Sequence, residues 1–281
     1  MKQKTKLYIE LGLGLLVGLT ALVVLAVVLV QNALKESAQA ETTQPTTETT
    51  VAAPTLPPNP YGPEDFRVEE NGYITCLTED APHGIDVSEW QGDIDWQQVK
   101  DSGIEFAIIR LGYRRSESGE LSTDEKALAN LQGASEAGLP IGAYFFSQAI
   151  STQEALEEAE YALSLLEGYT LTYPLIYDWE YLGEDARTAD VDARTLTDCI
   201  KTFCGRVEAE GYKSMIYFNP HFHENEVLYL DELTDYHFWL AMYDTRMDYP
   251  YQIDMWQYSC TGSVPGIYGD VDLNLYLPRK Q

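Results

Sequence analysis

The stretch that decides the fold reads Tyr173-Pro174-Leu175-Ile176-Tyr177-Asp178-Trp179-Glu180-Tyr181. It is short, apolar and aromatic, with β-branched Ile176 inside it and Pro174 at its start, which is typical of a buried strand. Side chains alternate between the two faces of a strand, so Asp178 and Glu180 point to the same side, with Cα atoms about 6–7 Å apart. We therefore expect two carboxyl groups on one face at the end of an apolar strand.

Two acids in this arrangement have a chemical use. They repel each other and lose hydration, which raises the pKa of at least one of them and keeps a carboxylic acid protonated near neutral pH. A protonated acid beside an ionised one is the basic equipment for cleaving a glycosidic bond. The alternative interpretation is a pair of solvated carboxylates at a strand end, and other parts of the chain must decide between the two.

The charge of the chain narrows the classes of partner. Its 281 residues include 45 acids and 18 bases, for a formal charge of −27. Contact with phosphates needs a basic surface, so this balance argues against nucleic-acid binding. The length suits one large α/β domain with appendages.

The N-terminal residues have the pattern of a membrane anchor. A basic tail at 1–10 precedes residues 11–30, which carry no charge. A run of this length spans a bilayer as a helix. Basic residues in front of it place the tail in the cytoplasm and the remainder of the chain outside the cell. Secretion after signal cleavage near Ala40 is the alternative, because Ala38-Gln39-Ala40 has the small residues of a cleavage site.

Residues 31–63 are predicted to form a disordered linker. From residue 37 onward they are rich in Thr and Pro and contain too little apolar surface to fold. The prolines stiffen such a segment into a spacer. Residues 64–82 read as an N-terminal extension of the domain that follows, with a small hairpin over 66–77 that turns at 70–72.

The globular domain, 83–281, alternates between strands and helices. We predict strands at 84–88, 105–111, 141–146, 173–181, 214–218, 237–243, 253–258 and 270–273, and helices at 94–102, 124–137, 152–167 and 190–210. This alternation predicts an α/β fold with a parallel sheet, either open or closed as a barrel. The helices are too few for a regular eight-helix barrel.

Acidic residues gather near the C-terminal ends of the predicted strands. They are Asp86, Asp178, Glu180, Asp244 and Asp272. In open sheets and in barrels alike, the functional site lies at this edge. We therefore expect an acidic site there.

Several motifs along the domain follow one another in the order of a known family. They are Gly84-Ile85-Asp86-Val87-Ser88-Glu89-Trp90-Gln91-Gly92, Ile94-Asp95-Trp96, Phe106-Ala107-Ile108-Ile109-Arg110-Leu111-Gly112-Tyr113, Ala143-Tyr144-Phe145-Phe146, Asp178-Trp179-Glu180, Trp256-Gln257-Tyr258 and Val271-Asp272-Leu273-Asn274. Through these motifs residues 83–277 resemble the family 25 glycoside hydrolases, which are the muramidases or Chalaropsis-type lysozymes.

The resemblance implies an irregular, flattened TIM-like β/α barrel with about eight strands and fewer helices than the regular form. It also implies hydrolysis of the β-1,4 bond between N-acetylmuramic acid and N-acetylglucosamine in peptidoglycan. Carried over by motif, Glu180 is the general acid/base and Asp178 is its partner, while Asp86 and Asp272 complete the acidic site. The anchor, the linker and the N-terminal extension are not part of the family domain.

Asp178 has two alternative roles in such a site. It attacks the sugar directly, or it orients the substrate's 2-acetamido group, whose carbonyl oxygen attacks instead. We favour the second role by analogy with other sites in which an Asp lies two residues before the acid. The candidates for sugar contact are Tyr144, Tyr217, Trp239 and Trp256. By strand alternation, Trp179 is expected to point away from the two acids.

No metal and no cofactor are expected. His221-Phe222-His223-Glu224 lacks a third ligand at a sensible spacing, and a retaining glycosidase has no need of one. Arg110 is expected to form a structural ion pair near the acidic site.

The chain contains four cysteines. A location outside the cell permits disulfides. Cys199 and Cys204 fall on different faces of one predicted helix, which argues against a bond between them. Cys76 and Cys260 are the candidate pair and would join the N-terminal extension to the domain. The chain is expected to be a monomer.

The favoured function is that of a membrane-tethered muramidase that acts on peptidoglycan from outside the cell. The alternative is a catalytically silent wall-binding module on the same fold, although a binding module has no need of Glu180. A hydrolase of another N-acetylhexosamine polymer, such as chitin, is a weaker alternative.

Overall fold

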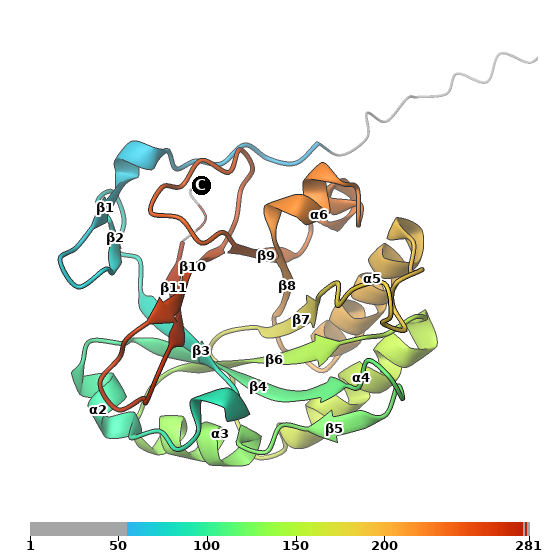
Figure 1. Ribbon diagram of the computed structural model, residues 1–281, viewed down its shortest axis with the longest axis horizontal. Helices are drawn as coiled ribbons and strands as arrows, with labels where there is room; N and C mark the ends of the chain where they lie inside the picture. The colour runs from blue at the N-terminus through green and yellow to red at the C-terminus, as the bar shows by residue number, and fades with distance from the viewer. Residues whose placement is uncertain (1–54, 278, 280–281) are drawn as a thin grey trace, which may run out of the picture. The chain divides into compact units, whose positions relative to one another are not determined.

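The computed structural model describes residues 55–277 and residue 279 (Figure 1). The predicted membrane helix at 11–30 and the first part of the predicted linker, 31–54, lie outside this range. Within the described range, no helix has both the length and the apolar character needed to cross a membrane.

Eight strands close into a barrel, in the order β3-β11-β10-β9-β8-β7-β6-β4, and β4 pairs again with β3. Their bounds are β3 (His83–Val87), β4 (Phe106–Arg114), β6 (Ile141–Ser147), β7 (Leu175–Trp179), β8 (Ser214–Phe218), β9 (His237–Ala241), β10 (Met255–Gly262) and β11 (Val271–Tyr276). The predicted eight-stranded α/β barrel is therefore confirmed.

The nine-stranded sheet, which includes the barrel, departs from a uniform parallel arrangement at two places. β11 runs antiparallel to both of its neighbours, β10 and β3. The loop between β10 and β11, residues 263–270, is too short for the crossover that a parallel pair requires. A short strand that the sequence pattern did not predict, β5 (Leu121–Thr123), pairs antiparallel with β4 outside the barrel.

The helices cover part of the barrel. They are α2 (Trp96–Asp101), α3 (Ala127–Glu136), α4 (Thr152–Leu165), α5 (Ala193–Ala209) and α6 (Pro220–Glu224). Short 3-10 helices are η1 (Pro63–Asp65), η2 (Glu89–Gln91) and η3 (Leu230–Leu233). The longer helices α3, α4 and α5 lie along β4, β6 and β7 (Figure 1), whereas β9, β10 and β11 follow one another without an intervening α-helix. The prediction of a barrel with few helices is confirmed.

Alternation along β7 separates two apolar layers. Ile176 points into the barrel with Ile108 and Met215, whereas Tyr177 and Trp179 belong to the layer outside it. The Trp179 ring meets Phe222 of α6 edge-on, with centroids 5.7 Å apart, so the prediction that Trp179 points away from the two acids is confirmed. Asp178 consequently faces the barrel interior.

The N-terminal end of the barrel interior is packed with aromatic rings. Phe106 stacks on Tyr173 with centroids 4.3 Å apart, and Tyr276 meets both rings edge-on. A Cβ atom at Gly84 would lie 2.2 Å from the Phe106 ring, so only glycine fits there. This end is therefore filled, and polar side chains occupy the opposite end, at the carboxyl ends of the strands.

The N-terminal extension packs against the barrel. β1 (Phe66–Val68) and β2 (Ile74–Cys76) form the predicted hairpin, and Gly72 closes its turn with a positive φ of 83°. Ahead of it, the end of the predicted linker also contacts the domain, because Pro58 bridges to Tyr251 and the Asn59 amide donates to the Pro250 carbonyl at 2.9 Å. Residues 55–63, at the end of the predicted linker, thus pack on the domain.

The predicted disulfide between Cys76 and Cys260 is wrong, because both residues are free thiols in the structure. Cys76 is buried on β2, with its sulfur 3.6 Å from the Thr78 hydroxyl, whereas Cys260 is exposed on β10. The two thiols therefore occupy different environments, one facing the core and the other facing solvent. Cys199 and Cys204 are also free, as expected.

Candidate active site

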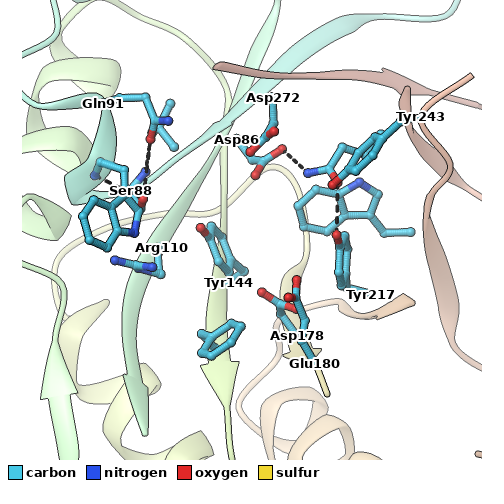
Figure 2. Close-up of a pocket in the computed structure, with 15 residues that line it drawn as sticks. Asp86, Ser88, Gln91, Arg110, Tyr144, Asp178, Glu180, Tyr217, Tyr243 and Asp272 are labelled. Atoms are coloured by element: carbon cyan, nitrogen blue, oxygen red, sulfur yellow. Dashed lines mark hydrogen bonds between the residues drawn. The ribbon is translucent and has the colours of Figure 1, made fainter. Parts of the chain in front are cut away.

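A cavity of about 190 Å³ opens at the carboxyl ends of the barrel strands (Figure 2). The cavity is lined by all four acids that the sequence analysis placed in the site. Asp86, Asp178 and Asp272 belong to β3, β7 and β11, and Glu180 directly follows β7. The cavity is lined by Asp86, Val87, Ser88, Trp90, Gln91, Arg110, Tyr144, Phe146, Asp178, Glu180, Tyr217, Trp239, Tyr243, Gln257 and Asp272. Asp86, Asp178 and Glu180 reach the cavity from the carboxyl ends of β3 and β7. Asp272 was expected at the end of a strand, but it lies at the start of β11 and reaches the same edge because β11 is antiparallel.

Asp178 and Glu180 point into the cavity from the end of β7, as the strand pattern predicts (Figure 2). Asp178 is 6% exposed. Its Oδ1 atom is buried and has no hydrogen-bond partner among the described residues. A buried carboxylate oxygen without a partner is costly, so this atom needs a donor that residues 55–277 do not supply.

Asp86 and Asp272 form a second carboxyl pair across the cavity. They are register partners on the antiparallel strands β3 and β11. Asp86 Oδ2 accepts hydrogen bonds from Gln257 Nε2 at 2.8 Å and from Asn274 Nδ2 at 2.7 Å. A side-chain hydrogen bond between the two acids raises the pKa of Asp272 and opposes the rise that burial gives the pKa of Asp86. Two ionised carboxylates in contact repel each other, so the pair favours a state with one proton, held by Asp272.

Burial raises the pKa of every acid in the cavity. The pKa of Asp178 lies well above its usual value, first because of burial and then because of the charges of Glu180 and Asp86. Burial and the charge of Asp86 raise the pKa of Glu180. Burial and Asp86 raise the pKa of Asp272 to about 9. The cavity therefore retains protons at pH values where ordinary carboxyl groups are ionised.

Three of the four predicted sugar-contacting aromatics line the cavity, namely Tyr144, Tyr217 and Trp239. The Trp239 ring meets Tyr217 edge-on at 4.8 Å and its Nε1 donates to Asn274 at 2.8 Å. Trp256 does not line the cavity. It is fully buried outside the barrel against Phe66, so it cannot contact a substrate in this structure.

Comparison with known proteins identifies the family. The model of the glycosyl hydrolases family 25 matches residues 85–267. The chain belongs to this family. It is 34% identical over 206 residues to the YegX protein of Escherichia coli, a match that covers 69% of each protein. It is 29% identical over 203 residues to lysozyme M1 of Streptomyces globisporus, which covers 69% of this chain and 67% of that protein.

Solved structures of related enzymes have a similar fold. The modular autolysin LytC of Streptococcus pneumoniae matches with a TM-score of 0.64 and 25% identity, over 75% of this chain and 52% of that chain. The chain thus spans about half the length of that autolysin. A bacterial lysozyme from Streptomyces coelicolor matches with a TM-score of 0.57 and 28% identity, over 70% of this chain and 92% of that chain.

Two amide residues of the family 25 domain support the acids, and the sequence analysis did not select them. The Gln257 amide oxygen accepts hydrogen bonds from the Tyr217 and Tyr243 hydroxyls, at 3.1 and 3.0 Å, so its amide nitrogen faces Asp86. Asn274 links Asp86 to Trp239. Alternation on β10 and β11 was the available signal, because it places both amides on the inward face.

Arg110 is held by structural ion pairs, as predicted. Its Nε donates to Asp124 at 2.7 Å and its Nη2 donates to Glu89 at 2.8 Å. These contacts attach η2 to β4 at the rim of the cavity. Next to Glu89, the Trp90 side chain also lines the cavity and is 78% exposed, so it is accessible to a ligand.

A second cavity of about 480 Å³ adjoins the first on the side of α6. Glu180, Tyr217 and Tyr243 line both cavities, so Glu180 lies at their border. Apart from Glu180, none of the described residues that line the second cavity is an acid. Asn219 contributes a buried Oδ1 atom without a hydrogen-bond partner among the described residues.

The remaining polar candidates lie outside the acidic cavity. Asp244 does not line it, and its carboxylate instead accepts from the Thr245 and Arg246 amides of its own turn. His221 is exposed and its Nδ1 lies 3.5 Å from Glu224. Among the described residues, no three His, Cys, Asp or Glu side chains are grouped so that they could hold a metal ion.

Proposed function

We propose that this chain is a peptidoglycan hydrolase of the lysozyme type, which cleaves the β-1,4 bond between N-acetylmuramic acid and N-acetylglucosamine. The observation that carries the proposal is the position of Glu180, a carboxyl group with a raised pKa at the border of an acid-lined cavity and an acid-poor one. A general acid must lie between the two sugars whose bond it cleaves. Relatives named as a lysozyme and an autolysin support the same assignment.

In the proposed reaction, the muramic acid residue occupies the acid-lined cavity and the leaving sugar occupies the second cavity. The acetamide N–H of the muramic acid residue donates to Asp178 Oδ1, the buried atom that lacks a partner. This hydrogen bond favours the ionised form of Asp178, so that of these two acids Glu180 carries the proton. Substrate binding therefore favours the protonation state that the reaction needs, in which Asp178 is ionised and Glu180 is protonated.

Two steps then cleave the bond with retention. The acetamide carbonyl oxygen attacks the anomeric carbon while Glu180 gives its proton to the departing glycosidic oxygen. An oxazolinium ion (a protonated oxazoline) forms, and its N–H still donates to Asp178. Glu180, now ionised, takes a proton from water, which attacks the same carbon and reopens the ring. Asp86 and Asp272 hold a negative charge near the developing positive charge of the sugar.

The products of digestion test this proposal. The full-length chain is incubated with purified peptidoglycan, and the new reducing ends are reduced with borohydride and identified after acid hydrolysis. We expect reduced muramic acid. Reduced glucosamine would contradict the assignment of the bond. Tight sedimentation with peptidoglycan but no new reducing ends would instead identify a wall-binding module.

The role of Asp178 predicts the behaviour of the Asp178→Asn variant. Loss of the carboxylate that holds the acetamide is expected to lower kcat about 100-fold or more. The wild-type chain is expected to hydrolyse a synthetic muramic acid oxazoline, since the mechanism passes through that intermediate. Asp185→Asn, at an exposed position in the following loop, is the matched control. A covalent glycosyl adduct on Asp178, detected by mass spectrometry, would show direct attack instead.

The pH dependence of activity follows from the raised pKa of Glu180. Activity requires the protonated acid, so kcat/KM is expected to fall as pH rises through this pKa. Because the charge of Asp86 helps to raise it, Asp86→Asn is expected to move this fall in activity to lower pH. The measurement is a pH profile of kcat/KM for wild type, Asp86→Asn and the exposed control Asp270→Asn. An unchanged profile in Asp86→Asn would argue against electrostatic coupling between the two sites.

We also propose that residues 11–30 anchor the enzyme in the cell membrane with the barrel outside. The uncharged apolar run and the lysines before it support this location. Fractionation distinguishes the anchor from cleavage near Ala40, because a cleaved chain would leave the membrane fraction and begin at residue 41.

A further inference from the structure

The residue that carries the proposed acid lies just beyond the sheet. The last register pair of β7 with β6 joins Trp179 to Ser147, so Glu180 follows the end of that ladder. The chain then continues in a long loop, 180–192, before α5 begins. The position of the Glu180 carboxyl group therefore depends on what holds the start of this loop.

Gln148 holds the start of the loop with its side chain. It follows β6 directly and is fully buried. Its Nε2 donates to the main-chain carbonyl of Glu180 at 2.9 Å and to the carbonyl of Ser147 at 2.9 Å. Its Oε1 accepts from the Thr188 hydroxyl, also at 2.9 Å. One amide group thus joins two points of the same loop that lie eight residues apart.

Arg187 holds the backbone of Gln148 and is itself held by an ion pair. Arg187 donates through Nη1 to the Gln148 carbonyl at 2.6 Å and forms a two-pronged ion pair with Glu154, at 2.7 and 2.8 Å. Glu154 belongs to the first turn of α4 and also accepts from the Ile150 amide at 3.0 Å. Paired hydrogen bonds between a guanidinium and a carboxylate restrict orientation as well as distance.

We propose that Gln148 is a positioning residue, which fixes the Glu180 carboxyl group relative to the scissile bond by holding the Glu180 main chain. Thr188 and Arg187 act through Gln148, because they orient its amide and secure its backbone. The inference rests on the proposed function, since it concerns the acid of that reaction. A displacement of about 1 Å at a catalytic group lowers rates about 100-fold, so a hydrogen bond to its main chain has a measurable effect.

The test compares Thr188→Val, which removes the hydroxyl donor at nearly constant shape, with Thr188→Ser, which retains it. We expect Thr188→Val to lower kcat on peptidoglycan about tenfold with KM within about twofold, and Thr188→Ser to match wild type. On an aryl glycoside with an activated leaving group, which needs no proton from Glu180, Thr188→Val is expected to keep most of its activity. A merely structural role would lower both activities equally.

A second readout does not depend on turnover. The ¹³C shift of the Glu180 carbonyl is expected to change in Thr188→Val and in Arg187→Gln, because its hydrogen bond from Gln148 weakens, and to remain as in wild type in Thr188→Ser. Equal losses on both substrates, or full kcat on peptidoglycan with an unchanged carbonyl shift, would overturn the proposal. Failure of the proposed function is recognised separately, because wild type itself would then release no reducing ends.

Discussion

The Glu180→Gln variant is expected to lose about 10³-fold in kcat on peptidoglycan, while KM stays close to that of wild type. Gln has nearly the same shape as Glu but cannot give a proton to the departing oxygen, and general acid catalysis contributes about 10²–10⁴-fold. The main-chain contact from Gln148 does not involve the altered side chain, so the loop should keep its conformation. The rate of new reducing ends, measured over a range of substrate concentrations, gives both constants.

The choice of substrate separates this role from general damage to the site. An aryl glycoside whose leaving group departs without protonation should be cleaved by Glu180→Gln with a much smaller loss. Glu184→Gln, four residues further along the same loop and exposed, is the matched control and should behave as wild type. Equal losses on the two substrates would mean that Glu180 does not act as the general acid.

The site could be predicted from sequence where its geometry depends on local periodicity. Asp178 and Glu180 share a face because side chains on a strand alternate, whatever surrounds the strand. Asp86 reaches the same cavity because β3 and β7 run in the same direction, through the parallel pairs β3–β4, β4–β6 and β6–β7, and end at one edge of the barrel. Asp272 was assigned to the site from the order of the family motifs. The rule for parallel strand ends does not apply to it, because β11 runs in the opposite direction to its neighbours.

The features that sequence missed depend on contacts between distant segments. Trp256 has an aromatic ring of the kind that stacks on sugars. However, it lies on the outer face of β10, where Phe66 of the N-terminal extension covers it. Nothing in the pattern around Trp256 shows that the N-terminal extension covers it. Likewise, Gln148 appears as an ordinary polar residue after a strand, and its role depends on Thr188, forty residues later. Such long-range partners require the three-dimensional structure.

The Arg114→Met variant is expected to cost about 3–5 kcal/mol of unfolding free energy at pH 8, because it leaves a buried carboxylate without its cation. Arg114 is 4% exposed, and its Nε donates at 2.7 Å to Glu158 of α4, which is fully buried. Two more hydrogen bonds join Arg114 to the carbonyls of Gly119 and Glu154. Chemical denaturation at several pH values, followed by circular dichroism, measures the loss, and Arg115→Met at the exposed neighbouring position should cost less than about 1 kcal/mol.

The pH dependence of this loss distinguishes an unpaired charge from lost packing. Burial raises the pKa of Glu158 from its ordinary 4.5 to about 7 in the folded chain, although Arg114 opposes the rise. Because the pKa of Glu158 is higher in the folded chain than in the unfolded chain, protonation of Glu158 stabilises the fold. This contribution is complete below pH 4.5 and is lost as pH rises through about 7. Without Arg114 this pKa rises further, so the deficit of Arg114→Met should shrink between pH 8 and pH 5 as Glu158 takes up a proton. Replacing both residues by Met should recover much of the deficit at pH 8, because no buried charge then remains at this position between β4 and α4. A deficit that is the same at both pH values, and unchanged in the double variant, would mean that Arg114 stabilises the barrel through packing alone.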